Sequence, residues 1–188
     1  MSRAYRITIA ESLSRHVQVD DGVCSNLELL PILGKGAMGA LLSAELEQKG
    51  FLREGDHAVR KDPDGITVKV NVESGEVAIT VEGHVDLDLE TQRTRVILNT
   101  NAVDPQLEEQ LRAAAKEQLD REAQAEEEAL RRKVTAQLEA KLKDLKEELD
   151  AVVNKVTASA LKKRAGELGT VEEIHEDGSG NLTIKVRI

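Results

Sequence analysis

Hydrophobic and polar residues alternate with a period of two over much of the first hundred residues, which is typical of half-buried β-strands. The alternation covers four stretches, residues 5–9, 13–19, 66–72 and 77–89. We expect Asp20-Asp21-Gly22 to end the earlier strands. The later two are separated and preceded by turn sequences rich in Pro, Gly, Asp and Ser, at residues 62–65 and 73–76. The pattern predicts a small, mainly antiparallel β-rich head over residues 1–103.

One short helix interrupts this alternation. Residues 37–49 carry apolar side chains three and four positions apart, and Gly50 follows them as a stop. Residues 27–33 are apolar but contain Pro31, which argues against a central strand, so we expect a packed, partly extended connector. Gly83 occupies an inward position of a strand and predicts a bulge or bend there.

The pattern changes at residue 104, where a long helix is predicted. Asp104 suits the N-cap and Pro105 the first helical position, and no Gly or Pro occurs again until Gly166, which we expect to end the helix. A helix of this length spans about 90 Å. Opposite charges four residues apart add support along it. We predict a charged, coiled-coil-like helix over residues 104–168.

An apolar stripe runs along this helix, and we expect it to require a partner helix in order to leave water. Its mean spacing exceeds 3.5 residues, so a sustained left-handed two-stranded coil is not favoured. We predict that the second half of the stripe mediates protein association, through Leu130, Val134, Leu138, Leu142, Leu145, Leu149, Val152 and Val156.

The chain ends in a predicted β-hairpin over residues 169–188, because alternation resumes on both sides of the turn-rich residues 177–181. A two-stranded hairpin is marginal alone in water, so we expect it to dock on a head sheet. Either the long helix bends back to its own head, or two chains lie antiparallel and each hairpin completes the partner's head. No loop residue marks a bend within residues 120–129, so we favour the unbroken helix and the antiparallel homodimer. The fold class is α+β.

Composition supports a small head carrying an exposed rod. The 188 residues include one Tyr, one Phe and no Trp, which is little aromatic area for a single globule of this size. The formal net charge is −9 and no basic stripe is present, so we expect no nucleic-acid partner. No apolar run approaches the roughly 18 residues that cross a bilayer. Cys24 is the single cysteine, and we expect a cytoplasmic protein.

One glycine-rich segment offers a candidate nucleotide site. Residues Gly34–Gly39 match G-x-G-x-x-G, and Asp56 lies about 20 residues further on, where a ribose-binding acid is sought. The motif needs a preceding buried strand, which Pro31 opposes, and hairpins follow in place of repeated βα units. We favour a flexible entry into a short helix.

The remaining chemistry-bearing residues are scattered. The four histidines, at His16, His57, His84 and His175, lack second ligands at metal-binding spacings, and Cys24 has no histidine to activate it. We expect His16 and His84 on an exposed strand face and Cys24 as a small buried hydrophobe. An acidic ladder, formed by Glu82, Asp86, Asp88 and Glu90, is expected to be a solvated face. We therefore predict no catalytic residue, no cofactor and no metal, and hence no enzyme.

The start and the end of the chain resemble the accessory proteins of bacterial ternary systems built around MoxR-like and FtsH-like AAA+ ATPases. The resemblance lies in YRITIAESLSRHVQVDDGV with LELLPIL at the start and in ALKKRAGELGTVEEIHEDGSGNLTIKVRI at the end. The central KDPDGITVKVNVESGEVAITVEG resembles small hairpin proteins found beside such ATPases. The resemblance implies a partner of an AAA+ ATPase complex and carries over no active-site residue.

Three functions stand as hypotheses at this point. The first is a non-enzymatic structural or adaptor subunit, a scaffold in a cytoplasmic protein complex that includes the AAA+ ATPase. The second is a nucleotide-binding protein or enzyme that uses residues Gly34–Gly39. The third is a prefoldin-like holdase whose helices clasp client proteins.

Overall fold

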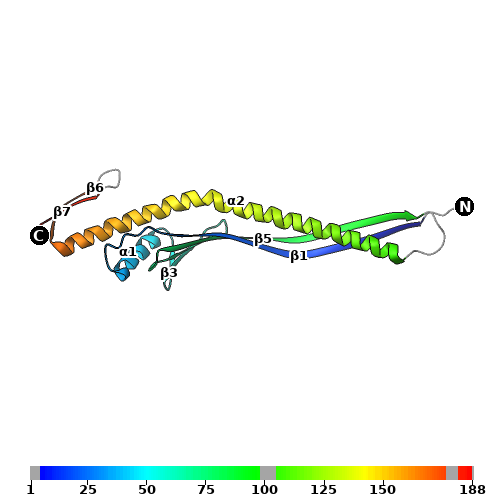
Figure 1. The fold of residues 1–188 in the computed structure, drawn as a ribbon, viewed down its shortest axis with the longest axis horizontal. Coiled ribbons are helices and arrows are strands. Elements are labelled where there is room, and N and C mark those ends of the chain that lie inside the picture. Colours follow the sequence, from blue (N-terminus) through cyan, green and yellow to red (C-terminus); the bar gives the residue numbers. More distant parts are fainter. Residues whose placement is uncertain (1–4, 98–104, 177–181, 188) are drawn as a thin grey trace. The chain divides into compact units, whose positions relative to one another are not determined.

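The computed structural model describes residues 5–97, 105–176 and 182–187, and its fold is α+β as predicted (Figure 1). Five of the described strands form one antiparallel sheet in the order β1-β5-β4-β3-β2, and β6 and β7 form a second sheet. The elements are β1 (Tyr5–Asn26), α1 (Lys35–Gln48), β2 (Leu52–Glu54), β3 (His57–Lys61), β4 (Ile66–Asn71), β5 (Glu76–Ile97), α2 (Pro105–Leu168), β6 (Thr170–Glu176) and β7 (Leu182–Arg187).

The chain divides into two compact units, and each is described by itself. The first unit contains Met1–Asp20 and Glu82–Thr135, and the second contains Asp21–Val81 and Ala136–Ile188. Strands β1 and β5 and helix α2 contribute residues to both units.

In the first unit, β1 and β5 form a two-stranded ribbon. Each step forward along β1 is matched by an equal step back along β5, which is the antiparallel register. Side-chain hydrogen bonds between the strands fix this register, with Thr8 to Thr94 at 3.1 Å, Ser14 to Asp88 at 2.6 Å and His16 to Asp86 at 2.6 Å. These polar pairs share one face of the ribbon and are exposed, as predicted for His16 and the acidic ladder.

Helix α2 covers the other face of this ribbon. Val17 and Val19 of β1 and Leu87 of β5 are buried together with Ala123 of α2. Four partly buried residues surround them, namely Leu13, Val85, Leu89 and Leu130. Arg112 of α2 reaches Glu11 of β1 with its Nε 2.9 Å from the carboxylate. In this unit, the apolar residues of the alternating pattern in β1 and β5 are therefore covered by the chain's own helix.

Gly83 allows the helix to lie close to β5. A Cβ atom at this position would come within 2.5 Å of Val134 Cγ2 and 3.2 Å of Leu130 Cδ1. The sequence predicted a bulge or bend at this glycine. What the structure shows instead is that a side chain here would collide with buried Val134.

In the second unit, three successive hairpins, β2–β3, β3–β4 and β4–β5, build the sheet. Strand β4 pairs antiparallel with β5, with Val68 opposite Ile79, and with β3 on its other side. Both predicted turns are present, and Gly65 and Gly75 adopt φ of 78° and 76°, the left-handed region that glycine tolerates best. Strands β2 and β3, which carry few apolar residues, were not predicted from the sequence.

One face of this sheet carries the core of the second unit. Ile66, Val68 and Val70 of β4 are fully buried, and the facing residues of β5, Val77, Ile79 and Val81, are buried with them. Helix α1 contributes Leu42 and Leu46, and the C-terminal half of α2 contributes Leu145, Leu149, Val152 and Val156. The structure thus confirms helix α1, which was predicted over residues 37–49, and shows that its apolar side chains are buried.

Arg60 of β3 connects both helices to the sheet. Its guanidinium donates two hydrogen bonds to Glu148 of α2, at 2.9 and 3.0 Å, and one to Asp62 at 2.9 Å. It also donates to the Lys49 carbonyl at 3.2 Å and lies 4.7 Å from the centre of the Phe51 ring. The hydrogen bond that Arg60 donates to Glu148 is the main cause that raises the pKa of Arg60, and partial burial opposes it.

Two glycines that were predicted to end elements, Gly22 and Gly166, lie inside them, although the range predicted for the long helix, 104–168, ends at the same residue as α2. Strand β1 continues through Asp20-Asp21-Gly22 to Asn26, and a Cβ on Gly22 would lie 2.9 Å from the Ile79 carbonyl oxygen. Gly22 is therefore needed for close approach to β5 and does not mark a turn. Helix α2 continues past Gly166 to Leu168, because an internal glycine costs a helix only about 1 kcal/mol. The predicted N-cap, Asp104, and the turn at residues 177–181 lie outside the described residues.

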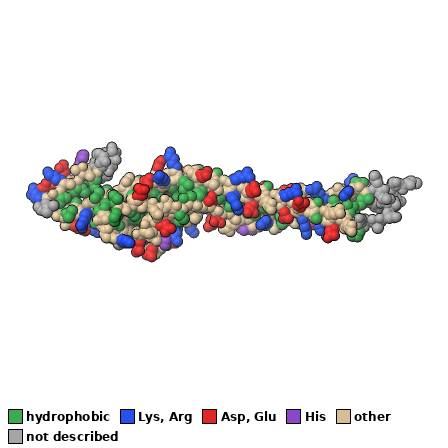
Figure 2. Space-filling model, viewed as in Figure 1, with side chains coloured by type: hydrophobic (Ala, Val, Ile, Leu, Met, Phe, Trp, Pro, Cys, Tyr) green, Lys and Arg blue, Asp and Glu red, His purple; other side chains and the backbone are tan. Residues whose placement is uncertain are grey.

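The predicted C-terminal hairpin is present, with Ile174 of β6 opposite Ile184 of β7. The two strands form a sheet of their own in this chain. The docking of this hairpin on a head sheet stays a prediction. Helix α2 is one continuous helix, as favoured from the sequence, and Figure 2 shows acidic and basic side chains interspersed along it.

Candidate functional site, a groove beside helix α2

The predicted association stripe lies mainly on the buried side of α2. Six of its eight residues are buried within the single chain, namely Val134, Leu138, Leu145, Leu149, Val152 and Val156, while Leu130 and Leu142 are partly exposed. A second chain is therefore not required to remove these six side chains from water. The association role of the stripe as a whole stays a prediction.

An open groove of about 840 Å³ lies in the second unit, next to the partly exposed Leu142. Its apolar surface comes from the end of β1, the connector after it, β5 and α2, with Val23, Leu27, Leu30, Val77, Ile79, Leu142, Leu149 and Val153. Leu30 is 58% exposed and Val23 is 39% exposed, so the groove presents aliphatic surface to solvent.

The register of the sheet explains why this groove exists. The close approach of Gly22 to Ile79 and Thr80 aligns the end of β1 with the start of β5, so Val23 lies on the same face as Ile79. That face is the one on which α2 packs, yet Val23 and Leu30 remain exposed. The helix therefore leaves the β1 side of its own sheet uncovered.

Polar side chains line the groove along α2. Lys146, Asp150 and Asn154 follow each other at four-residue intervals, which places them on one side of the helix. Glu28 adds a second carboxylate from the connector. An apolar floor with a polar rim is the arrangement typical of protein-binding surfaces. One lysine among two carboxylates is a poor environment for phosphate groups.

The glycine-rich candidate site is placed at the N-terminus of α1. Gly34 is the N-cap residue in extended conformation, and a Cβ on Gly39 would lie 3.0 Å from the Val72 carbonyl oxygen, so Gly39 allows α1 to pack on the sheet. Residues 27–34 are neither helix nor strand, so the buried strand that precedes a dinucleotide-binding loop is not formed here. Asp56 lies in the turn between β2 and β3, and its carbonyl accepts from Val72.

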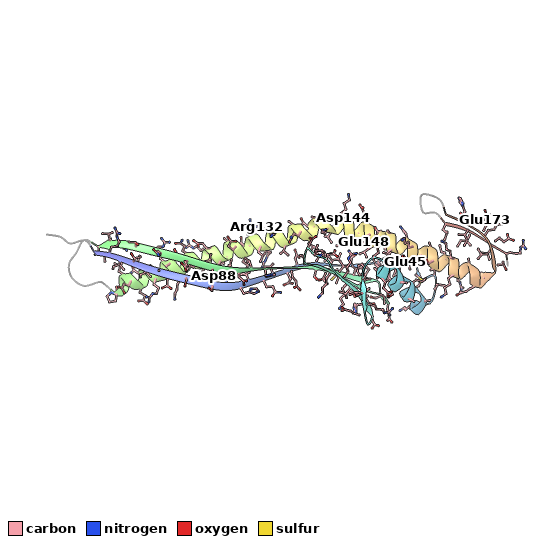
Figure 3. The ribbon with its side chains drawn as sticks, turned by 180° about the vertical axis from the view of Figure 1, so that it is seen from behind. Glu45, Asp88, Arg132, Asp144, Glu148 and Glu173 are labelled. Carbon is pink, nitrogen blue, oxygen red and sulfur yellow. The ribbon has the colours of Figure 1, made fainter. Side chains whose placement is uncertain are left out.

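Two of the four histidines come together on the polar face of the first unit. His16 Nδ1 lies 2.6 Å from Asp86 Oδ1, which accepts the hydrogen bond, and the His16 ring stacks on that of His84 at 6.1 Å between centroids. Asp88, labelled in Figure 3, accepts from Ser14 on the same face. Within the described residues, no group of three metal-ligating side chains is assembled.

The other candidates are separate from this face. His57 begins β3 and is half-buried, and His175 lies exposed on β6. Cys24 is exposed, so its predicted burial was wrong. The physical reason is the alternation of β1, because Cys24 points to the opposite face from Val23.

Sequence reasoning missed the groove because its residues follow no period. Val23 and Leu30 lie in segments that were interpreted as a turn region and a connector. The exposure of these two side chains is visible only in the structure, so the sequence offered no direct signal for the groove.

The fold and the groove define an α+β protein in which a long helix packs along the strands of its own chain and leaves part of a sheet face open. The chain belongs to the family described as FtsH ternary system domain X5, whose model matches residues 1–188. No curated protein and no solved structure matches the chain. Neither α1 nor α2, over the residues that the structure describes, has an apolar stretch long enough to cross a membrane.

Proposed function

We propose that this protein is a non-enzymatic adaptor subunit of an FtsH-associated ternary system, and that it binds a partner protein through the groove beside α2. The observation that carries the proposal is the pair of exposed aliphatic side chains in the groove, Val23 and Leu30, which lie beside the buried Ile79. The family description supplies the system, since it names FtsH. The proposed partner is accordingly the FtsH-type AAA+ ATPase.

The shape of the groove favours an amphipathic helix as its occupant. The lining residues of α2 run from Leu142 to Thr157, which is about 22 Å of helix, or four turns. A partner helix beside α2 would cover Val23 and Leu30 with its apolar side. Charged residues on its flank would meet Lys146 and Asp150, whose opposite signs fix its direction.

A cytoplasmic address completes the proposal. Cys24 is a free thiol on the surface, and an exposed thiol persists in a reducing compartment. Neither the nucleotide-binding alternative nor the holdase alternative is favoured by a specific contact, and both stay predictions.

Binding of the purified chain to the FtsH-type ATPase tests this function. Leu30→Asp places a carboxylate on the apolar floor and is expected to weaken binding by about tenfold or more, the effect of removing an interface anchor. Leu52→Asp is the matched control, because Leu52 is 73% exposed and lies outside the groove, and it should change the Kd little.

Biolayer interferometry on both variants, with circular dichroism to verify folding, gives the readout. Equal weakening by the two substitutions would reject the groove as the binding surface. Absence of any binding by the unmodified chain to the ATPase would reject the proposed partner.

A further inference from the structure

We propose that two copies of this chain associate through the outer edge of β1, in an antiparallel pairing of residues 6–20 about a two-fold axis at Leu13. Strand β1 ends the sheet order, so among the described strands it has a neighbour on one side only. Its outer edge therefore presents backbone N–H and C=O groups that a further strand can pair with. This surface is separate from the groove, and the inference goes beyond the proposed function.

The edge lacks several devices that usually prevent such pairing. Residues 5–20 contain no Pro, no Gly and no Lys. The devices it does have are Glu11 and Arg15, two charged residues on the face that α2 covers. A foreign strand, or a wrong register, would place an apolar side chain against one of these charges.

In the register centred on Leu13, each of these two charges faces an opposite charge of the second copy. Glu11 then lies opposite Arg15 of the second copy, and Arg15 lies opposite Glu11 of that copy, as two-fold symmetry requires. On the outer face, Arg6 lies opposite Asp20 in the same way. Opposite charges in directly facing positions stabilise antiparallel pairs.

The apolar residues match in the same register. On the helix-covered face, Ile7 lies opposite Val19, Ile9 opposite Val17, and Leu13 opposite itself. Ile7, Ile9 and Leu13 are half-buried in the single chain, so pairing removes further aliphatic surface from water. Both the charges and the apolar residues of one strand thus find suitable partners in its copy.

Neighbouring registers fail on the same residues. Centring on Ser12 places Ile9 opposite Arg15 and Glu11 opposite Leu13, and centring on Ser14 places Glu11 opposite Val17. Registers in which the two-fold axis falls between two residues bring the apolar face of one strand beside the polar face of the other. The sequence of β1 is therefore self-complementary at one register.

The edge of β5 is a worse candidate for self-pairing. An antiparallel pairing of two β5 strands centred on Asp88 would place Asp86 of each copy opposite Glu90 of the other. Like charges in facing positions destabilise a sheet. A pairing of β1 with β5 of another copy is heterologous and would give a ring or an open filament in place of a two-fold dimer. The β1 edge is the one that gives a closed dimer.

Helix α2 is compatible with this arrangement. Ala123 packs on residues of both β1 and β5, so each helix covers a ribbon of two strands. Adjacent ribbons in a four-stranded sheet are about 10 Å apart, since strands are about 4.8 Å apart, and this matches the usual spacing of packed helices.

Sedimentation equilibrium on the full chain tests the dimer, whose mass is twice the 20.6 kDa of one chain. Arg6→Asp and Asp20→Arg each place like charges at both symmetric positions, and each is expected to weaken self-association about tenfold. An equimolar mixture of the two variants should recover the wild-type affinity, because each chain then faces its opposite charge. Recovery on mixing excludes a merely structural effect of either substitution.

Disulfide formation tests the register directly. In a Cys24→Ser background, Leu13→Cys places two thiols across the symmetry axis, within the Cα distances that disulfides span, and should give a covalent dimer on oxidation. Arg15→Cys is the matched control. The two cysteines at position 15 lie several residues apart along the paired strands, so this variant should form no covalent dimer. A monomeric wild-type chain, failure of the mixed variants to recover, or equal cross-linking of both cysteine variants would each overturn the proposal.

Discussion

Arg60 shows how a single residue can organise the second unit. Its side chain is only 16% exposed, and it bridges the C-terminal end of α1, the turn after β3, and α2. On α2, Glu148, which is labelled in Figure 3, accepts two hydrogen bonds from it. The raised pKa means that the folded state binds this proton more tightly than the unfolded chain does. Its stabilising effect is therefore present below the ordinary pKa of arginine and is lost only as pH rises through the higher folded value.

Replacing Arg60 tests this bridge. Arg60→Ala leaves Glu148 without its bidentate donor and is expected to lower the free energy of unfolding by about 2 kcal/mol, between the effects of exposed and buried ion pairs. Arg132→Ala is the control, because it removes an exposed pair with Glu128 and should cost only about 0.5 kcal/mol. Urea unfolding followed by circular dichroism measures both. Equal losses would show that Arg60 acts as an ordinary surface residue.

At the scale of elements, the turns and strands of β4 and β5 were predictable because their signals are local. Gly65 and Gly75 lie at positions that need a positive φ, and alternation marks the strand that follows each of them. What covers a strand or a helix could not be predicted in the same way. Periodicity identifies the apolar side of α2, but it does not distinguish a partner helix from the chain's own β1 and β5.

The packing of α2 on β5 at Gly83 gives a prediction at this scale. Gly83→Ala forces a methyl group against Val134 and is expected to cost roughly 2 kcal/mol, typical of overpacking. Gly166→Ala is expected to have the opposite sign and to gain up to about 1 kcal/mol, since no atom lies within 4 Å of its added Cβ in the helix. Thermal and urea unfolding of both variants gives the comparison.

A second substitution makes this prediction specific. Val134→Ala in the Gly83→Ala background should recover part of the loss, so that the two changes are coupled in a double-mutant cycle. Additive losses would contradict a direct contact between the two positions.

At the scale of the whole molecule, α+β composition, the long helix and the terminal hairpin were predicted, and membership of the FtsH ternary system domain X5 family agrees with the resemblance found in the sequence. The groove was not predicted, because the register of β1 and β5, which places Val23 beside Ile79, is not visible in the sequence. The sequence predicted that the apolar stripe of α2 needs a partner helix to leave water. In the structure, six of the eight residues of the predicted association stripe are buried within one chain, which leaves the groove and the β1 edge for partners.

Amide hydrogen exchange across α2, measured by mass spectrometry at decreasing protein concentration, tests that claim most directly. We predict strong protection of residues 145–156 that does not change on dilution, because Leu145, Leu149, Val152 and Val156 are buried by the same chain. Fast exchange in this segment, or protection that disappears as the protein is diluted, would contradict the account.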